Sequence, residues 1–516
     1  MVGLVGITLW TGAAFGGEAT GAETGKPPAP AAAADRLVPV EIGKRRELFL
    51  DDVMVDRMTG AVQRVFHSPV PREIVMVFDR PWEGNLCQYH TLFRDGDLYR
   101  FYYLPGSYTI PPEGGKRTMG FGGWAYAESR DGVHWTRPNL GLVEFAGSKE
   151  NNLLPITGSV TAVFRDENPA APPEARYKAL GDRSGPGEWK DAPKYLFGLQ
   201  SPDGLHWTAV PGEIMRRDGW YFDSQNVAFW DPNINHYRVY YRAGSQRGRG
   251  IETAVLTDFS QGPSAGAPLK YRREPHGEFY TNVIRPYHRA PHLYIGMPSM
   301  YGDRGWTPAL EQLPDLTNRR LQSSAGQRLG TALTDTMLMW SRDGVNFELA
   351  PSTFLTPGPE RSGSWMYADH RAAWHVVETA PALEGADPEL SLYCSEGARV
   401  GPMRLRRYTL RLDGFASIHA SLDGGELATP PVVFQGSRLS MNFATSTFGS
   451  LRVELQDTDG KPIPGFALAD SVELYGDTVA RAARWNNDPD LGTLAGKPVR
   501  LRFVLRDADL YSLKFE

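Results

Sequence analysis

The chain has 516 residues, of which 41% are hydrophobic and 22% are charged. This length predicts two or more domains, and the composition is that of a globular protein with a sizeable core. The net charge of −5 leaves no basic stripe to neutralise phosphates, which argues against nucleic acid as a partner. The 55 glycines, 40 prolines and 11% aromatic residues favour strands and tight turns over helices.

The chain begins with an apolar run from Val2 to Phe15, followed by small residues. This pattern is typical of a secretory signal and predicts a secreted or periplasmic protein. A membrane anchor is the alternative, but the run is shorter than the roughly 20 residues that span a bilayer, so we expect no membrane span. Residues 17–36 are rich in Gly, Ala, Pro and Thr. We therefore predict a signal peptide and a disordered linker over residues 1–36.

A motif of the form Ser-x-Asp-Gly-x-x-aromatic occurs at 129–135, 201–207 and 341–347. Asp-Gly is a strong hairpin-turn signal because glycine accepts the positive φ that such turns need. The aromatic residue then begins the returning strand and can pack over the turn. We expect the turn aspartates to be structural and the accompanying histidines to lie on the surface. These residues are Asp131, Asp203, Asp343, His134 and His206.

A tyrosine-rich hairpin alternates with this turn, and five copies are found at 89–103, 160–180, 227–241, 283–297 and 372–393. Five inner hairpins alternating with outer hairpins indicate four-stranded blades around an axis. The sequence thus predicts an all-β fold with a five-bladed β-propeller over residues 37–410. The expected blades are 75–135, 136–207, 208–270, 271–347 and 348–410, and the segment Glu47 to Val55 is expected to add an outer strand that closes the ring.

The repeat ends near residue 410, and residues 411–516 contain short strands and Asp-Gly turns without a further copy. Segments 449–455 and 498–504 alternate as half-buried strands do. Such strands pack naturally as two sheets, so we predict a C-terminal β-sandwich over residues 411–516.

The two cysteines, Cys87 and Cys394, fall in the first and last expected blades, which are neighbours in a closed ring. Export permits a disulfide between them, and two buried thiols are the alternative. No Cys/His spacing typical of a metal site occurs in the sequence. We expect no cofactor, and a structural calcium ion is left open.

The Ser-x-Asp-Gly-x-x-Trp turns, the Asp-Gly-x-Tyr-x-x-Tyr-Tyr hairpin and the trailing sandwich together resemble the five-bladed propeller glycoside hydrolases of the invertase/levanase and arabinanase/xylosidase groups. The resemblance covers residues 45–516 at the level of architecture. It implies a glycosidase that acts on a carbohydrate substrate, a poly- or oligosaccharide. The Trp-x-Asn-Asp-Pro-Asn-Gly element of invertases is missing, and Asp182-Arg183 is a poor substitute for their Arg-Asp-Pro triplet. The turn motif also resembles the Asp-box of sialidases, without its usual spacing.

Families that this chain resembles place their catalytic carboxylates where the innermost strands start, around one end of a central funnel. Glu83, in a Glu-Gly-Asn segment similar to the Glu-Gly-Pro element of the arabinanase group, is the expected general acid. Asp223 is the expected base or nucleophile, and Asp369 is the expected third carboxylate. One carboxyl group would protonate the leaving group while another activates water or attacks the sugar. The structural alternative for each residue is a turn or cap role.

Other polar and aromatic residues near the strand starts are candidates for substrate binding. Hydroxyl or carboxylate contacts are expected from Gln88, Asn226, His370 and Arg371, with further polar groups in Tyr280 and Asn282 and stacking platforms in Trp82, Tyr89 and Trp365. Less favoured catalytic carboxylates are Asp51, Asp52 and Asp335.

Two further functions compete with glycoside hydrolysis. A non-catalytic carbohydrate-binding propeller predicts an aromatic, uncharged funnel. A sialidase-like or lyase-type enzyme for acidic sugars predicts an arginine cluster, because guanidinium groups bind carboxylates in a bidentate manner. The arginines considered for that cluster are Arg285, Arg289, Arg304 and Arg371.

Overall fold

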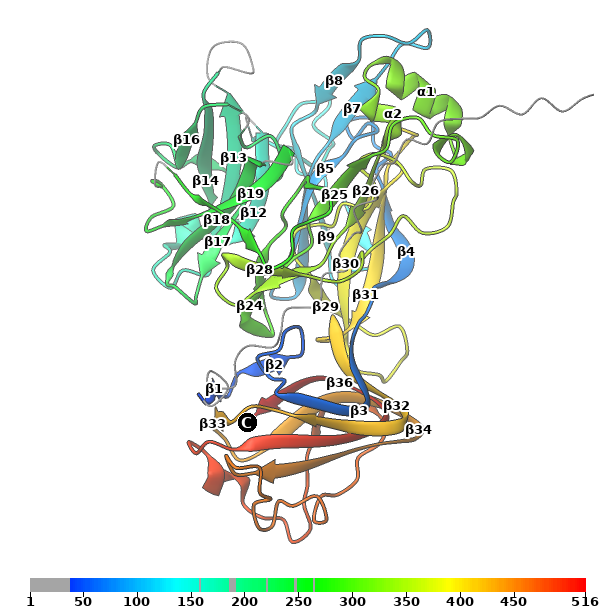
Figure 1. Cartoon of the computed structure of the whole chain (residues 1–516). Coiled ribbons are helices and arrows are strands. Elements are labelled where there is room, and N and C mark those ends of the chain that lie inside the picture. Colours follow the sequence, from blue (N-terminus) through cyan, green and yellow to red (C-terminus); the bar gives the residue numbers. More distant parts are fainter. Residues whose placement is uncertain (1–37, 157–158, 185–191, 220, 246–247, 263–264) are drawn as a thin grey trace, which may run out of the picture. The chain divides into compact units, whose positions relative to one another are not determined.

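A computed structural model describes residues 38–516, except for 157–158, 185–191, 220, 246–247 and 263–264 (Figure 1). The predicted signal peptide and linker, residues 1–36, lie outside the described residues. Strands dominate the rest, which confirms the all-β prediction, and the helices α1 (Leu316–Ser324) and α2 (Arg328–Thr331) are short. In the part of the chain that the structure describes, no helix is long and apolar enough to cross a membrane.

Five sheets of four or five strands follow one another along the described residues from 70 to 411, and we call them blades 1 to 5. Their strand pairs are antiparallel except for β21 and β28 in the fourth, and a five-bladed propeller stays a prediction. Blade 1 contains β5 (Gln88–Asp95), β6 (Leu98–Leu104), β9 (Trp124–Ser129), β10 (Trp135–Thr136) and β11 (Leu153–Leu154). Blade 2 contains β12 (Ser159–Arg165), β13 (Tyr177–Ser184), β14 (Lys194–Ser201), β15 (Thr208–Ala209) and β16 (Met215–Arg217). Blade 3 contains β17 (Val227–Asp231), β18 (His236–Ser245), β19 (Gly248–Leu256) and β20 (Ala267–Pro268).

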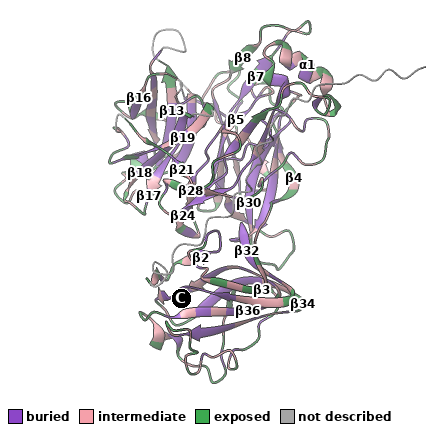
Figure 2. Cartoon of the chain, viewed as in Figure 1, coloured by how far each residue is buried: buried purple, intermediate pink, exposed green. Residues whose placement is uncertain are grey.

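Blade 4 contains β21 (Lys270–Tyr271), β23 (Arg285–Tyr287), β24 (Ala290–Gly296), β27 (Met339–Ser341) and β28 (Asn346–Leu349). A three-stranded sheet continues it through β22 (Glu278–Phe279), β25 (Ser299–Asp303) and β26 (Ala332–Thr336). Blade 5 contains β29 (Val377–Thr379), β30 (Glu389–Glu396), β31 (Arg404–Arg411) and β4 (Val70–Val77). A separate hairpin joins β7 (Gly106–Thr109) to β8 (Thr118–Phe121). β30 is buried almost throughout, whereas β4 on the rim is mostly exposed (Figure 2).

The strand that closes the ring is not the predicted one. β4, from early in the chain, pairs with β31 in blade 5, and Val77 lies opposite Arg404. The prediction for the Glu47 to Val55 segment was wrong, since β2 (Arg46–Leu48) pairs instead with β36 (Arg500–Phe515). The first predicted blade also began too early, because residues 75–77 belong to the last blade.

Two strands within residues 40–66 pair with strands of the C-terminal region. β3 (Arg57–Phe66) pairs with β32 (Ala416–Ala428), and that sheet continues through β36, β34 (Leu439–Gln456) and β35 (Asp477–Ala482). β1 (Val40–Gly43) pairs with β33 (Val432–Phe434). The predicted propeller boundary at residue 37 was therefore too early, because residues 40–66 supply strands to the C-terminal sheets. These strands enclose a separate apolar core, in which Phe434 stacks on Phe515 at 3.8 Å. A two-sheet sandwich stays a prediction for this region.

Each Asp-Gly turn is held by its own side chains. In the first copy, Ser129 Oγ accepts the Gly132 N–H at 2.9 Å, and Asp131 Oδ1 accepts two further N–H groups at 2.8 Å. The Trp135 indole N–H donates to the Gly132 carbonyl at 3.1 Å. The other two copies repeat the serine and aspartate contacts. These hydrogen bonds explain the structural role predicted for the three turn aspartates.

The same turns also link neighbouring blades. The hydroxyl of Tyr102 in blade 1 donates to the Gly204 carbonyl in blade 2 at 3.2 Å. Tyr240 in blade 3 makes the matching bond to Gly344 in blade 4 at 2.8 Å. Because these tyrosines belong to the second strand of the inner hairpin, the two sequence repeats bind each other across the blades.

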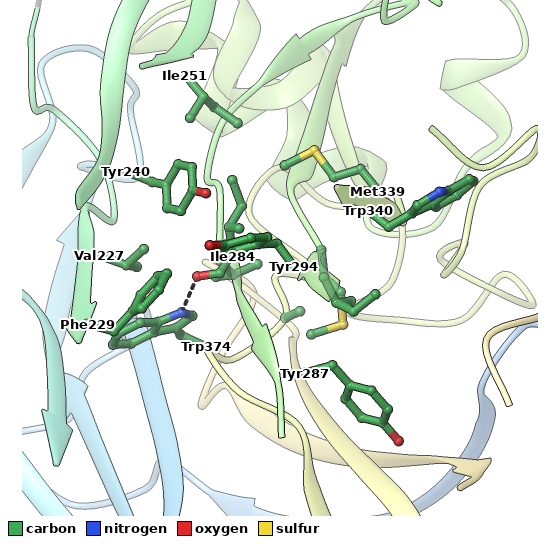
Figure 3. Packing of buried hydrophobic residues seen from close by; sticks show 14 of the residues in the cluster. Val227, Phe229, Tyr240, Ile251, Ile284, Tyr287, Tyr294, Met339, Trp340 and Trp374 are labelled. Carbon is green, nitrogen blue, oxygen red and sulfur yellow. Dashed lines mark hydrogen bonds between the residues drawn. The ribbon is translucent and has the colours of Figure 1, made fainter. Parts of the chain in front are cut away.

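Trp374 packs beside Phe229, and its indole points toward the Ile284 backbone (Figure 3). It is fully buried, its backbone N–H donates to the His90 carbonyl at 2.8 Å, and its indole N–H donates to the Ile284 carbonyl at 3.0 Å. Phe164 and Phe229 pack against its ring with centroids 6.4 Å away. Trp374 precedes β29, so residues of all five blades converge on one side chain.

Candidate active site

Side chains at the starts of the inner strands share one end of the blades. The first two strands of a blade form an antiparallel hairpin, so the second strand finishes where the first begins. In blade 2, Ser159 at the start of β12 lies opposite Asp182 near the end of β13. The same end of blade 3 carries Asp223 just before β17 and Arg242 near the end of β18.

The backbone at these starts is strained. Tyr89 (φ 54°), Phe222 (φ 65°), Val283 (φ 40°) and His370 (φ 53°) lie in the left-handed region, one for each of blades 1, 3, 4 and 5. That conformation costs a residue other than glycine about 1–2 kcal/mol. Strain of this kind concentrates at sites where the direction of a side chain matters. Its repetition in four blades makes this end a candidate for the functional site, although other residues such as Asn235 and Asp507 also have a positive φ.

The pKa of Tyr89 responds to several charged groups at this end of the blades. Burial raises the pKa of its phenol well above the usual value, and the charges of Tyr280, Asp223 and Asp182 act in the same direction, whereas Arg371 opposes them. Arg371 Nη1 also donates to Gln88 Oε1 at 3.1 Å. Groups from every blade thus contribute to one site. We call it the strand-start cluster, and it comprises Gln88, Tyr89, Asp182, Asp223, Arg242, Tyr280, Tyr367, Arg371 and Arg399.

Arginine and tyrosine side chains alternate in this cluster. The Arg371 guanidinium lies 4.1 Å from the centroid of the Tyr280 ring, and that of Arg242 lies 4.7 Å from the same ring. Arg399 lies 4.6 Å from the ring of Tyr367. Burial alone would raise the pKa of Tyr280, but the positive charges of Arg371 and Arg242 lower it to about 8.

Asp182 has the properties of a general acid. Burial raises the pKa of its carboxyl group to about 8, and the negative charge of Asp223 contributes to the rise. Asp182 is partly buried and remains within reach of solvent, whereas Asp223 is exposed. At neutral pH the cluster therefore contains one protonated carboxylic acid, Asp182, and one solvent-exposed carboxyl group, Asp223.

Glu83, the predicted acid, does not join the cluster. Its side chain is fully buried, and its oxygens accept hydrogen bonds from the Tyr103 hydroxyl and from Arg137 Nη1, each at 2.6 Å. The Arg80 backbone N–H donates to the same carboxylate at 2.8 Å. Glu83 thus holds a loop to blade 1 and offers no accessible proton, which argues against the catalytic role predicted for it.

Asp369 is also enclosed in backbone contacts. It is fully buried, and its carboxylate accepts the N–H groups of Ala398 at 2.9 Å and Met366 at 3.2 Å. Burial raises its pKa to about 7. Its neighbour His370 is buried among Glu396, Arg361 and Arg406. Neither side chain contacts the strand-start cluster, so the roles predicted for them have no support in the geometry.

Four other predicted binding residues serve the fold. The Asn226 amide donates to the Phe222 and Ser224 carbonyls and accepts the Arg242 N–H. The Asn282 amide donates to the Gln225 and Tyr240 carbonyls. Trp82 donates to Asn152 Oδ1 at 2.8 Å, and Trp365 donates to the Gly358 carbonyl at 2.9 Å. Of the predicted site residues, the cluster therefore contains Asp223, Gln88, Tyr89, Tyr280 and Arg371.

The less favoured carboxylates also lie elsewhere. Asp51 pairs with Arg342 at 2.7 Å, and Asp52 pairs with Arg64 at 2.7 Å. Asp335 lies on β26 opposite Met300, and burial raises its pKa to about 6. Among the arginines considered for an acidic-sugar site, Arg371 belongs to the cluster. Arg285 pairs with Glu167, Arg289 pairs with Glu378 and Asp413, and Arg304 is exposed.

The sequence prediction set Asp182 aside as a poor match to the Arg-Asp-Pro triplet and did not include Arg242, Tyr367 or Arg399. Asp182 and Arg242 lie on second strands, whereas the predicted residues lie near the starts of first strands. The hairpin register provided a signal, because a residue opposite the start of the first strand occupies the same end of the blade. Tyr367 and Arg399 come from irregular segments around blade 5, for which no repeat gave a register.

A cavity of about 410 Å³ is lined by residues of blades 1, 2, 4 and 5, among them Phe93, Arg165, Val283 and His375. Four of its charged groups form two pairs: Arg285 with Glu167 at 2.9 Å, and His288 with Glu378 at 3.0 Å. It offers no protonated acid beside an accessible carboxylate, so we place the candidate site at the strand-start cluster instead.

Cys87 and Cys394 are free and buried, so the alternative of two buried thiols holds and the disulfide prediction does not. Within the residues that the structure describes, no group of three or more His, Cys, Asp or Glu side chains could hold a metal ion.

The sequence matches no family model and no curated protein. Among solved structures, the chain is similar to a protein described as a glycoside hydrolase, with 13% identity and a TM-score of 0.42 over 66% of this chain and 92% of that one. A GH43B protein of a Bacteroides ovatus xyloglucan locus gives 10% identity and a TM-score of 0.35 over 86% and 100%. A Bombyx mori GH32 beta-fructofuranosidase gives 11% and 0.35 over 87% and 94%.

Identities and TM-scores this low assign neither a substrate nor a catalytic residue to this chain. What the chain shares with these proteins is a distant likeness of fold.

Proposed function

We propose that this protein is a glycoside hydrolase whose catalytic pair is Asp182 and Asp223. The observation that carries the proposal is the contrast between the two carboxyl groups. Burial and the charge of Asp223 raise the pKa of Asp182 to about 8, while Asp223 itself is exposed. Two carboxyl groups whose surroundings separate their protonation states are what an acid and a base require.

In the proposed reaction, Asp182 donates its proton to the glycosidic oxygen as the bond from that oxygen to the anomeric carbon breaks. Asp223 acts on the anomeric carbon, either by removing a proton from an attacking water or by attacking directly. Gln88 and Tyr89 lie beside this pair and are proposed to bind sugar hydroxyls or stack on the ring.

The non-catalytic alternative has less support. A carbohydrate-binding propeller predicts an uncharged aromatic funnel, whereas the strand-start cluster carries Asp182, Asp223 and Arg371 among its tyrosines. Binding that survives replacement of both aspartates by asparagine, with no hydrolysis by the wild type, would favour that alternative.

The test uses leaving groups of different acidity. Wild type, Asp182→Asn and Asp223→Asn are assayed on aryl glycosides with 4-methoxyphenyl and 2,4-dinitrophenyl leaving groups, and on plant and algal polysaccharides. Loss of a general acid slows poor leaving groups by about 10²–10⁴-fold but spares good ones, because a dinitrophenolate departs without protonation. Loss of Asp223 should slow both kinds.

The matched control is Asp97→Asn, which makes the same chemical change on an exposed turn. It should leave every rate unchanged. Equal losses for Asp182→Asn on both leaving groups would contradict the acid role. Unchanged rates in both site variants, with hydrolysis by the wild type, would place the catalytic pair elsewhere.

A further inference from the structure

We infer that Arg371 and Arg399 bind an anionic group, a carboxylate or a sulfate ester, on the sugar substrate. This inference rests on the proposed function and adds the substrate class to it: an acidic sugar such as a uronate or a sulfated hexose. The anion would sit within the strand-start cluster, because Arg371 Nη1 donates to Gln88 Oε1 at 3.1 Å and its guanidinium lies 4.1 Å from the Tyr280 ring centroid.

The first observation is that Arg371 and Arg399 are buried without a counter-ion. Arg371 and Arg399 are only 7% and 8% exposed. The Nε atom of each is buried without a hydrogen-bond partner. Within the described ranges, neither guanidinium forms an ion pair. Burying an unpaired charge is costly, so proteins normally pair such groups.

Other buried arginines of this chain follow that rule. Arg238 pairs with Asp231 at 2.8 Å, and Arg407 pairs with Glu73 at 3.0 Å. Arg319 has no carboxylate, but all three of its guanidinium nitrogens donate to backbone carbonyls. By contrast, Arg371 and Arg399 each donate one hydrogen bond, to Gln88 Oε1 at 3.1 Å and to the Tyr367 carbonyl at 3.0 Å, and their other contacts are tyrosine faces, which compensate a cation only in part. Among the described residues, the cluster residue Arg242 is also buried without an ion pair, and it donates to the Tyr280 carbonyl at 2.5 Å.

The second observation is the crowding of like charges. Arg371, Arg399 and Arg328 lie 5.7, 4.6 and 5.7 Å from the centroid of one ring, that of Tyr367. Each positive charge disfavours the others: burial lowers the pKa of Arg399, and the charge of Arg371 acts in the same direction. In the described part of the chain, none of the three is within 4 Å of a carboxylate oxygen. An oxyanion bound between them would relieve both the repulsion and the missing hydrogen bonds.

The experiment measures binding separately from hydrolysis. Titration calorimetry is carried out with D-glucuronate, D-glucose 6-sulfate, D-glucose and inorganic phosphate. The proteins are wild type, Arg371→Gln, Arg399→Gln and Arg371→Lys, with Arg272→Gln as the matched control, since Arg272 is an exposed residue paired with Glu348. Thermal unfolding confirms that each variant is folded.

We expect one of the acidic sugars to bind more tightly than glucose. Loss of a charge-assisted hydrogen bond should raise its Kd by about 10- to 100-fold in Arg371→Gln and Arg399→Gln, and leave Arg272→Gln unchanged. Arg371→Lys should recover part of the affinity, because lysine keeps the charge but not the planar fork. In hydrolysis assays, the matching acidic aryl glycoside should be cleaved faster than the neutral one.

Three results would overturn the inference. Equal binding of acidic and neutral sugars would do so, and so would binding that is insensitive to both glutamine variants. Cleavage of neutral glycosides only when phosphate is added, with phosphate as the one anion bound, would show that the oxyanion is a co-substrate rather than part of the sugar. Acidic-sugar binding that depends on both arginines, with no hydrolysis of any substrate, would refute the proposed function and leave the anion site standing.

Discussion

The hydroxyl of Tyr393 in blade 5 donates a hydrogen bond of 2.6 Å to the carbonyl of Gly132 in blade 1, although the two residues are 261 positions apart in the chain. Gly132 lies in the first Asp-Gly turn, so the motif that repeats along the sequence also joins the last blade to the first. With β4 on the rim of blade 5, this bond gives the ring a second closure, nearer to its axis.

Replacing Tyr393 by phenylalanine should lower the free energy of unfolding by about 1 kcal/mol. The loss is modest because the Trp135 indole still donates to the Gly132 carbonyl. Urea unfolding followed by fluorescence measures it. The control is Tyr475→Phe, because Tyr475 is 65% exposed. Equal stability of the two variants would mean that the ring does not depend on this closure.

The glycine of the second Asp-Gly turn should tolerate no side chain. Gly204 has φ 81°, and a Cβ there would lie 2.4 Å from the Tyr102 hydroxyl oxygen. Gly141 has a similar φ of 68° but open space around its Cβ position. Gly141→Ala should therefore cost only the left-handed strain, about 1–2 kcal/mol, and Gly204→Ala should cost clearly more. Thermal unfolding of both variants tests this, and equal losses would refute the blade contact as the cause.

Glu83→Gln should damage stability rather than chemistry. The substitution leaves Arg137 without the carboxylate that it contacts at 2.6 Å, which should cost about 2–3 kcal/mol. Once folded, the variant should hydrolyse glycosides at the wild-type rate per molecule. Active-site titration combined with urea unfolding separates the two effects. A folded variant with a large loss of kcat would show that Glu83 takes part in catalysis.

The parts of the fold that could be predicted from sequence were those with a local cause. Asp131 and Gly132 define a turn through contacts within a few residues, and the same is true of the tyrosine-rich hairpins. Pairings between distant segments could not be predicted, because an alternating strand fits many edges. The Val70–Val77 and Arg46–Leu48 segments illustrate this: each is a short strand, and nothing near either one specifies its partner.

The candidate site was predictable to the extent that it follows first strands. Tyr89, Asp223, Tyr280 and Arg371 precede or begin inner strands, and the cluster contains all four. Glu83 occupies a similar position in the chain, but its oxygens are engaged by Tyr103 and Arg137. The direction of a side chain near a strand start depends on tertiary contacts, which a repeat in the sequence does not encode.

Asp182→Asn should stabilise the protein near pH 8 while it abolishes the acid. The folded pKa of Asp182 is about 8, well above the roughly 3.9 expected in the unfolded chain. Between these values the folded state holds a proton that the unfolded state releases, so the stability contribution of Asp182 is full below pH 4 and is lost as the pH rises to about 8. Asparagine cannot ionise and avoids this loss.

The gain should vanish near pH 4 and grow as the pH rises to 8, where the full shift of the pKa sets an upper limit of about 5 kcal/mol. Thermal unfolding of wild type and variant at pH 4, 6 and 8 measures it, with Asp97→Asn as the exposed control that should show no pH-dependent difference. A difference that is the same at all three pH values would mean that Asp182 ionises alike in the folded and unfolded chains. In that case the protonated acid required for leaving-group departure at neutral pH would have to be another residue.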